Sequence, residues 1–485
     1  MTLRAFDVRY LLPFTPRSIH AIGAGFEALL DAAASLGIND VDPAATEPPD
    51  LSVCRPKDAI RAFTFASPMI VVRGMLTPRA ARAARRNGYK IGRYHAWGHP
   101  EAVRVFVPAD DRPIGRRLVG AMTGTTLRSR VRNAALRVAV ELAASPPSAT
   151  VTICAQLSLR PALLAEAADP PLSCAHDGFH LDCGNGDDLQ RAVFHLYDST
   201  TPQAALKFSR VPDNVIPFER DEAGLHLIAE CPADIARHAP RLLGRGSLDH
   251  TPFSVESHAA GQPLSRWLDH DPHPRWVNAR VDDITGWIEA LQRSTTTRDQ
   301  HPIATIAMLD TAEMTRERRD RLVEALMHTP TVLSHADLGS WNILVDDLGF
   351  TVVDWEGATT GSPPLWDLWY FLADVSARRD ERHDVARRVT LTRDVFAGRH
   401  PRSGELMAAT QRVCAALEID RSFVGPLLAA CWLTHEQRRL VRLRATAASG
   451  EQVAPLDHVA RLAGVWFDDP DLGVDWPAYE RFVGA

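Results

Sequence analysis

The segment from Thr331 to Glu356, which reads TVLSHADLGSWNILVDDLGFTVVDWE, constrains this chain more than any other. A β-branched apolar run leads into Asp337, and Asn342 follows five positions later. A loop with this spacing presents a carboxylate, which can accept a proton from a hydroxyl group, and an amide oxygen, which can bind Mg²⁺. A second strand-like run delivers Asp354, a hard oxygen ligand of the kind that Mg²⁺ combines with phosphates. The segment therefore predicts phosphoryl-transfer chemistry, although an Asp-rich hairpin is the simpler alternative.

The sequence HADLGSWN at residues 335–342, followed by VDWE at 353–356, resembles the catalytic motifs of the aminoglycoside phosphotransferase and choline kinase family. The resemblance implies an α+β protein-kinase-like domain with two lobes, of which the C-terminal lobe is mainly helical. It also implies that ATP, or another nucleoside triphosphate, binds with Mg²⁺ and that the acceptor is the hydroxyl group of a small molecule.

The resemblance assigns a role to each residue of the segment. Asp337 takes the proton of the acceptor hydroxyl, and Asn342 and Asp354 bind Mg²⁺. Glu356 binds a second metal ion through water or holds the loop. His335 is a second catalytic candidate because it lies beside Asp337, but the family pattern favours a role in shaping the loop.

Three strand patterns upstream of the segment predict the small lobe. The third of these strands carries a lysine. Lys207 lies within an apolar strand, where its charge needs a partner. The resemblance implies two partners for this charge, namely the nucleotide phosphates and a glutamate on the next helix. Glu222 is the first choice for that glutamate and Glu219 the second. The turn that contains Gly184 and Gly186 fits a nucleotide-covering loop, because glycine lets backbone amides approach phosphate, but a plain hairpin connection is equally open.

The resemblance also locates the hinge between lobes near Glu256, where the backbone of residues 255–257 would meet a purine edge. The expected domains are an α/β module at 1–115, a basic linker helix at 116–150, the small lobe at 151–256 and the helical C-terminal lobe at 257–485. In the linker, six arginines alternate with apolar residues, which predicts a helix packed on a domain rather than one lying on a membrane.

Residues 1–115 carry a separate pattern. A short strand at 18–22 is followed by G-x-G-x-x-A at residues 23–28 and an apolar helix, which is the minimal dinucleotide or nucleoside fingerprint. Asp40 or Asp42 stands near the spacing of a ribose-binding carboxylate. The order of elements resembles a shortened methyltransferase core, so the module is expected to be Rossmann-like. It either binds such a ligand or is degenerate and binds nothing.

Composition limits the remaining choices. The net charge of −6 and the pI near 6.3 leave no overall basic signature for nucleic acid. The seven cysteines include no C-x-x-C pair, which favours reduced thiols, and no apolar run is long enough to span a membrane. A cytoplasmic protein is expected.

The most probable function on these grounds is transfer of a γ-phosphoryl group to an aminoglycoside, a sugar or an amino alcohol. Two alternatives stay open. The chain could be a kinase-fold binding or regulatory protein without turnover, or a bifunctional enzyme whose N-terminal module binds a nucleotide or S-adenosylmethionine.

Overall fold

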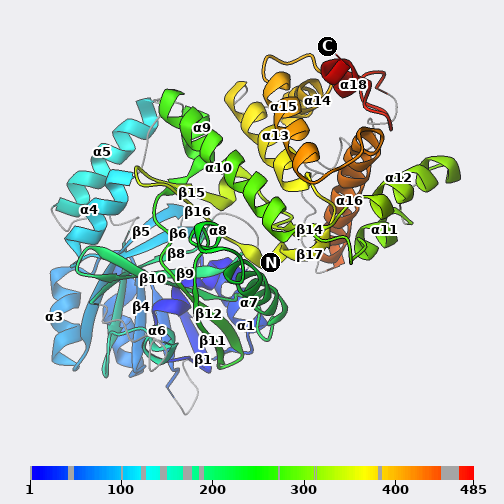
Figure 1. Cartoon of the computed structure of the whole chain (residues 1–485). Helices are drawn as coiled ribbons and strands as arrows, with labels where there is room; N and C mark the ends of the chain where they lie inside the picture. The colour runs from blue at the N-terminus through cyan, green and yellow to red at the C-terminus, as the bar shows by residue number, and fades with distance from the viewer. Residues whose placement is uncertain are drawn as a thin grey trace. The chain divides into compact units, whose positions relative to one another are not determined.

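The computed structural model describes residues 3–41, 48–99, 102–121, 127–141, 150–167, 177–184, 190–270, 274–310, 312, 314–380, 385–448 and 469–484. These residues group into two compact units. Unit 1 comprises Met1–Phe218 and Arg241–His258, and unit 2 comprises Glu219–Pro240 and Ala259–Ala485. Figure 1 labels their helices and strands.

Unit 1 is built on one twelve-stranded sheet with the order β11-β12-β10-β9-β8-β6-β5-β7-β4-β3-β1-β2 (Figure 1). Strands β2, β1, β3 and β4 pair in parallel, and the other neighbours are antiparallel. The strands are β1 (Ser18–Ile22), β2 (Asn39–Asp40), β3 (Leu51–Cys54), β4 (Met69–Arg73), β5 (Lys90–His99), β6 (Ala102–Pro108), β7 (Thr150–Ala155), β8 (Gly178–Asp182), β9 (Ala192–Asp198), β10 (Thr201–Phe208), β11 (Leu242–Leu248) and β12 (Thr251–Ser257).

The sheet joins the N-terminal module to the strands expected of the small lobe. Strand β6 pairs with β8 through Val105 opposite Asp182 and Phe106 opposite Leu181. Strand β7, which was expected to open the small lobe, instead lies between β5 and β4. The residue ranges given above for separate domains stay a prediction, but backbone pairing is continuous across the boundary predicted near residue 150.

Alternating side chains give this sheet two buried faces. In β4, Met69 and Val71 face one core, whereas Ile70 and Val72 face the other. The first core continues from Ile19 in β1 to Val255 in β12 as one hydrophobic cluster. The helical elements of unit 1 are η1 (Leu3–Leu11), α1 (Glu27–Ser35), η2 (Pro56–Asp58), α2 (Ala59–Ala62), η3 (Phe63–Phe65), α3 (Pro78–Arg86), α4 (Arg112–Ala121), α5 (Leu127–Glu141) and α6 (Ala162–Ala167).

Two predictions for unit 1 need correction. The apolar run at residues 63–72 predicts one strand, but its first part forms η3 and only β4 is extended. The chain turns at Ala66, whose φ is 53°, and Pro68 cannot donate a ladder hydrogen bond. The single linker helix is two helices, α4 and α5, and their Ile114, Val119 and Val140 pack against Trp97 and Val107.

Unit 2 is mainly helical, as expected, and carries two small sheets ordered β13-β15-β16 and β14-β17. The strands are β13 (Gln262–Pro263), β14 (Val332–Ser334), β15 (Ile343–Val345), β16 (Phe350–Val352) and β17 (Thr359–Ser362). The helices are α7 (Ile216–Ala229), which begins in unit 1, α8 (Ala233–Ala236), α9 (Leu264–His270), α10 (Pro274–Thr295), α11 (Ile303–Leu309), α12 (Arg316–His328), α13 (Trp366–Asp380), α14 (Val385–Phe396), α15 (Ser403–Ala416), α16 (Arg421–Ala448) and α18 (Pro477–Gly484).

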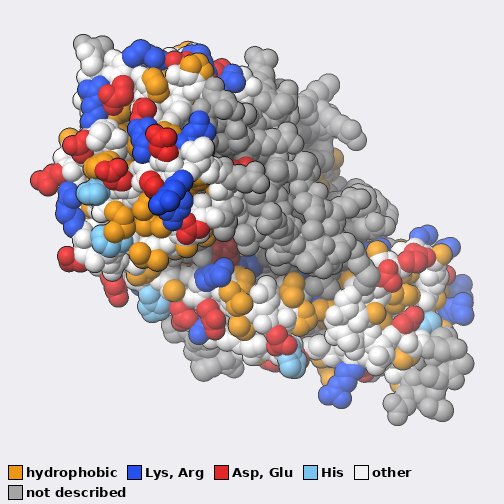
Figure 2. Space-filling model, turned by 90° about the vertical axis from the view of Figure 1, so that its right-hand side faces the viewer, with side chains coloured by type: hydrophobic (Ala, Val, Ile, Leu, Met, Phe, Trp, Pro, Cys, Tyr) orange, Lys and Arg blue, Asp and Glu red, His pale blue; other side chains and the backbone are white. Residues whose placement is uncertain are grey.

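Two observations concern the surface and the membrane. On the face shown in Figure 2, Lys and Arg side chains are interspersed with Asp and Glu over the coloured part. Within the described ranges, no helix is both long and apolar enough to cross a bilayer.

Candidate active site

Asp367, at the start of α13, holds the segment from β14 to β17 in unit 2 through hydrogen bonds. The Asp367 carboxylate accepts hydrogen bonds from the backbone N–H groups of His335 at 2.7 Å and Ala336 at 3.0 Å. It also accepts one from the Ser334 hydroxyl at 3.0 Å. Burial raises the pKa of the Asp367 carboxyl, while His335 and the donated hydrogen bonds act to lower it.

These bonds fix an uncommon backbone conformation. Ala336 has a φ of 65°, in the left-handed region that non-glycine residues rarely adopt. Conformations of this kind persist only where the surrounding structure holds them, and they concentrate at functional sites. Asp367 therefore positions the peptide units immediately before Asp337.

His335 links the loop to the second acidic segment. Its side chain is fully buried, and its Nε2 lies 3.0 Å from the Val353 carbonyl oxygen. Because a carbonyl only accepts, Nε2 carries the proton, and the described residues offer no hydrogen-bond partner to Nδ1. The ring also packs edge-on against Trp355. These contacts suit a histidine that holds the loop in shape.

Asp337 stands between two donors. The Tyr370 hydroxyl lies 3.4 Å from its Oδ1, and the Asn342 side-chain amide lies 3.3 Å from its Oδ2. The same Asn342 nitrogen donates to the Asp337 backbone carbonyl at 2.9 Å. Tyr370, on α13, was not foreseen from the sequence, because no motif spacing connects it with Asp337.

Asp354 follows β16, whose end lies beside Asn342, the residue before β15. The Val353 N–H donates to the Asn342 carbonyl at 2.9 Å, so the predicted metal ligands belong to adjacent ends of β15 and β16. Asp354 itself has a φ of 67° and begins the short turn η6 (Trp355–Gly357), which contains the half-buried Glu356. The structure thus brings Asp337, Asn342 and Asp354 onto one hairpin.

The donors on this hairpin suit Mg²⁺. A carboxylate and an amide oxygen are hard ligands, and Mg²⁺ is commonly bound by one or two of these together with substrate phosphates and water. Nothing in the described ranges gathers three or more His, Cys, Asp or Glu side chains as a metal site of their own. The Asn342 amide oxygen and the Asp354 carboxylate fit a Mg²⁺ ion whose other ligands come from elsewhere.

Helix α7 supports this hairpin through residues that the sequence did not reveal. The carboxylate of Asp221, almost fully buried, accepts the Trp355 backbone N–H at 3.0 Å. The next turn carries Gly224, where an added Cβ would lie 2.2 Å from the Trp355 carbonyl oxygen. The helix therefore approaches the hairpin backbone closely. The neighbouring Glu222, the predicted partner of Lys207, has its Oε1 4.0 Å from His226 Nε2.

In unit 1, Lys207 on β10 forms an ion pair with Glu256 on β12. The side chains are 13% and 3% exposed, so both charges are removed from most of the solvent. The two residues point to the same sheet face, since Ala205 is opposite Glu256 and lies two positions before Lys207. Two residues predicted to bind the nucleotide thus meet in unit 1, whereas a pair between Lys207 and Glu222 stays a prediction.

The backbone near Glu256 makes hydrogen bonds within unit 1. The Ser257 N–H donates to the Arg241 carbonyl oxygen at 2.8 Å, and the His258 N–H donates to the Gln203 carbonyl oxygen at 3.0 Å. The purine-edge contact expected of residues 255–257 stays a prediction.

The ends of the glycine turn are held by a buried arginine. The Arg210 side chain donates to the carbonyl oxygens of Cys183 and Gln190, which flank that turn. Its Nε also donates to Asp7 Oδ1 at 2.9 Å, and both side chains of this pair are buried. Gly184 has a φ of 58°, as a tight turn requires, while Gly186 lies outside the described residues.

The glycine pattern of the N-terminal module also forms a turn after a strand. Gly23 and Gly25 both have positive φ values, of 95° and 87°. The Gly25 N–H donates to the Glu27 side chain at 3.1 Å, so this amide of the turn is engaged within the protein. Asp40 is exposed in β2, and Asp42 lies outside the described residues. Ligand binding by this module stays a prediction.

Residues 185–403 match the family model described as the phosphotransferase enzyme family. The match covers the hairpin, Lys207 and Glu256, and it spans somewhat less than half of the chain. No curated protein matches the sequence.

Several solved structures of phosphotransferases are similar to this chain. Aminoglycoside phosphotransferase APH(3'')-Id from Streptomyces rimosus is 16% identical, with a TM-score of 0.34, 57% of this chain covered and 95% of that one. Macrolide 2'-phosphotransferase MphH from Brachybacterium faecium is 17% identical, with a TM-score of 0.34 and coverages of 63% and 96%. Choline kinase from Cryptosporidium parvum is 10% identical, with a TM-score of 0.33 and coverages of 61% and 86%. TM-scores this low carry no argument about the substrate.

Proposed function

We propose that this chain is an ATP-dependent phosphotransferase that moves the γ-phosphoryl group of a nucleoside triphosphate to a hydroxyl group of a small molecule. The observation that supports this most is the hairpin of unit 2, where Asp337, Asn342 and Asp354 stand within a region that matches the phosphotransferase family model. Aminoglycosides, sugars and amino alcohols are the acceptor types expected at the outset.

Asp337 orients the acceptor hydroxyl and takes its proton while the acceptor oxygen forms a bond to the γ-phosphorus. The bond between that phosphorus and the β–γ bridging oxygen breaks, and the nucleoside diphosphate leaves. Tyr370 and Asn342 contact opposite oxygens of the Asp337 carboxylate and so fix its orientation. Because little covalent chemistry is asked of the protein, positioning supplies much of the rate.

Asn342 and Asp354 would hold Mg²⁺, which when bound neutralises charge on the phosphates. Lys207 would contact the phosphates, and Glu256 keeps its ammonium group oriented through the ion pair. Glu222 and Gly184 are proposed to assist at the nucleotide, while Glu356 and His335 are proposed to hold the loop.

Turnover of ATP by purified wild-type protein and Asp337→Asn tests this function. The substitution keeps the size of the side chain but removes its basicity, so slow ATP hydrolysis should fall by about 10²–10⁴-fold while Mg²⁺-ATP binding persists. Asp347→Asn, an exposed residue of the neighbouring turn, is the matched control and should leave turnover unchanged. Equal hydrolysis by wild type and Asp337→Asn would contradict the mechanism. A wild type that binds Mg²⁺-ATP without any turnover would indicate a binding protein instead.

A further inference from the structure

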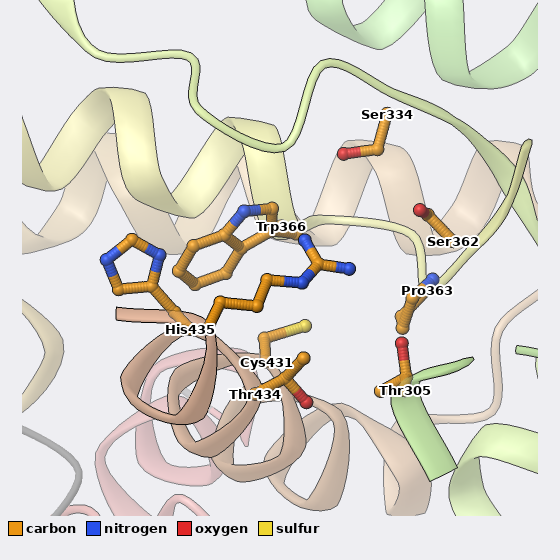
Figure 3. Close-up of a pocket in the computed structure, with 9 residues that line it drawn as sticks. Thr305, Ser334, Ser362, Pro363, Trp366, Cys431, Thr434 and His435 are labelled. Carbon is orange, nitrogen blue, oxygen red and sulfur yellow. The ribbon is translucent and has the colours of Figure 1, made fainter. Parts of the chain in front are cut away.

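Unit 2 contains a pocket beside the Asp337 loop whose chemistry differs from that expected for an amine-bearing acceptor. It has about 310 Å³ of empty space, part of it open to solvent. Helix α16 forms one wall, and α11, β14, β17 and the start of α13 form the others (Figure 3). The lining residues are Thr305, Ser334, Ser362, Pro363, Trp366, Cys431, Thr434, His435 and Arg438.

The lining contains one permanent cation and no carboxylate. Residues 431, 434, 435 and 438 are spaced so that they share one face of α16. Arg438 is half-buried, and no ion pair joins it to a carboxylate of the described chain. Burial lowers the pKa of the Arg438 guanidinium, and Cys431 and Asp367 oppose that shift only in part. Asp367 already accepts three hydrogen bonds from the loop before Asp337.

A buried hydroxyl in the same wall lacks a partner. Thr434 is only 5% exposed, and its Oγ1 makes no hydrogen bond within the described structure. A buried polar group without a partner is costly, and a bound polar ligand would satisfy it. A cation and an unsatisfied hydroxyl, separated by one helical turn, are complementary to an anionic oxygen group.

Buried aromatic rings connect the wall of this pocket with Asp337. Trp366 stacks on Tyr370 with ring centres 5.2 Å apart, and the Tyr370 hydroxyl lies 3.4 Å from Asp337 Oδ1. His435 lies against both rings, at 5.1 Å from Trp366 and 5.0 Å from Tyr370, and Figure 3 shows its ring beside that of Trp366. The pocket and the proposed base therefore contact the same pair of stacked rings.

Asp374 and the acidic residues at 380–384 would suit an amine-bearing acceptor, but Asp374 does not line the pocket. Asp374 on α13 is buried, accepts the Ser340 backbone N–H at 2.9 Å and pairs with Arg378 at 2.9 Å. The other candidates noted in the sequence, at 380–384, lie outside the residues whose side chains are described.

We propose that this pocket receives an anionic group, such as a carboxylate, of the hydroxyl-bearing acceptor, and that Arg438 is its counter-ion. The inference rests on the proposed phosphotransferase function and narrows its substrate class. It favours hydroxy acids, because the lining carries a cation and no carboxylate, and it disfavours polycationic aminoglycosides and amino alcohols.

Gluconate, glucose and glucosamine test the charge preference, because they are polyols of similar size with an anionic, a neutral and a cationic group. Their dissociation constants would be measured by tryptophan fluorescence, to which Trp366 in the wall contributes, and by ligand-observed NMR. Gluconate should bind at least about tenfold more tightly than glucose and glucosamine, as one charge-assisted hydrogen bond predicts. Absent gluconate binding, or binding no tighter than that of glucosamine, would overturn the proposal.

Arg438→Gln should abolish the preference for gluconate, and Arg438→Lys should retain part of it because the charge remains. Arg316→Gln, on the exposed surface of α12, removes a charge elsewhere in unit 2 and should change nothing. If Arg438→Gln still prefers gluconate, the carboxylate binds at another site and the proposal is wrong. Thermal unfolding checks that each variant is folded, and the wild-type comparison stands even if Arg438→Gln does not fold.

Mg²⁺-ATP binding by the same wild-type sample separates this proposal from the proposed function. If ATP binds but gluconate shows no preference, only the anionic-acceptor proposal fails. If gluconate is preferred through Arg438 but no nucleotide binds, the phosphotransferase function fails and the anion site remains.

Discussion

At the scale of single residues, the shape of the hairpin segment depends on buried side chains that bond to its backbone. Asp367 holds the peptide groups before Asp337, His335 ties the loop to Val353, and Asp221 ties α7 to Trp355. Each of these side chains is buried, and each bonds to backbone atoms rather than to another side chain alone. Loss of such a residue should therefore alter catalysis by moving Asp337 and not by removing a reacting group.

Asp367→Asn tests this positioning role. The amide keeps one acceptor oxygen but presents an N–H₂ group toward a backbone N–H donor, which leaves a buried donor unsatisfied. Unfolding free energy should fall by about 1–3 kcal/mol, as measured by urea unfolding. The turnover number for ATP should fall while the dissociation constant for Mg²⁺-ATP changes little.

Ser334→Ala is the matched comparison, because it removes one of the same hydrogen bonds but leaves both backbone bonds to Asp367 in place. Its effect on turnover should be smaller. Equal turnover by wild type and Asp367→Asn would show that the loop holds its shape without this carboxylate.

At the scale of secondary structure, helix α7 illustrates how packing overrides local preference. Glycine inside a helix is less favourable than alanine by roughly 0.5–1 kcal/mol. Gly224 is nevertheless required, because an alanine Cβ would meet the Trp355 carbonyl oxygen at 2.2 Å and the Ala358 side chain at 3.1 Å. The helix must move away from the hairpin to accept a larger residue.

Gly224→Ala and Gly286→Ala should therefore have opposite effects on stability. Gly286 lies within α10, is exposed, and has no atom within 4 Å of an added Cβ. Alanine at 286 should raise the unfolding free energy by up to about 1 kcal/mol, whereas alanine at 224 should lower it by about 1–3 kcal/mol. Thermal unfolding of both variants measures this, and a stabilised Gly224→Ala would contradict the close approach of α7.

Most elements could be predicted from the sequence where one local pattern determined them. The apolar runs at 18–22 and 51–54 predict the ranges of β1 and β3 without error, and the patterns at 78–87, 191–198 and 317–328 predict α3, β9 and α12 to within a few residues. The expected strand at 63–72 failed because Pro68 and the turn at Ala66 outweigh an apolar run. The pairing of β6 with β8 could not be predicted, since register between distant strands leaves no local signal.

The same reasoning explains which candidate site residues the sequence reveals. Asp337, Asn342 and Asp354 follow from spacing within one segment, and Lys207 follows from a charge placed in an apolar strand. Tyr370 and Asp221 contact the hairpin segment of unit 2 from separate elements, and in unit 1 Arg210 contacts both ends of the glycine turn. Only the folded chain shows these contacts. Arg438 was likewise hidden, because the sequence favours a solvated position for His435 and the arginines after it.

At the scale of the whole molecule, the N-terminal module and the strands that carry Lys207 form a single structural body within unit 1. One sheet and one hydrophobic cluster run from β1 to β12. The segment η1 adds a polar connection, because Tyr10 donates to the Ser209 carbonyl at 2.9 Å and Asp7 pairs with Arg210. The module should therefore be needed for the nucleotide-binding part even if it binds no ligand of its own.

Asp7→Ala tests that dependence. Removal of one partner from a buried ion pair leaves an uncompensated charge, so the unfolding free energy should fall by about 3–5 kcal/mol. Because Arg210 also holds both ends of the glycine turn, the dissociation constant for ATP should rise. Asp50→Ala, which removes a carboxylate bonded to the backbone of Arg17 and Ser18, is a control within the same module and should leave ATP binding unchanged. Unchanged stability and ATP affinity in Asp7→Ala would refute the coupling.

The most direct test of the central claim is the affinity for ATP, measured by calorimetry with and without Mg²⁺, in wild type and Asp354→Asn. The account predicts that Mg²⁺ strengthens ATP binding by the wild type, that Asp354→Asn loses most of this increase, and that Asp347→Asn keeps it. ATP binding that is absent, or that does not depend on Mg²⁺ and Asp354, would contradict the proposed phosphotransferase.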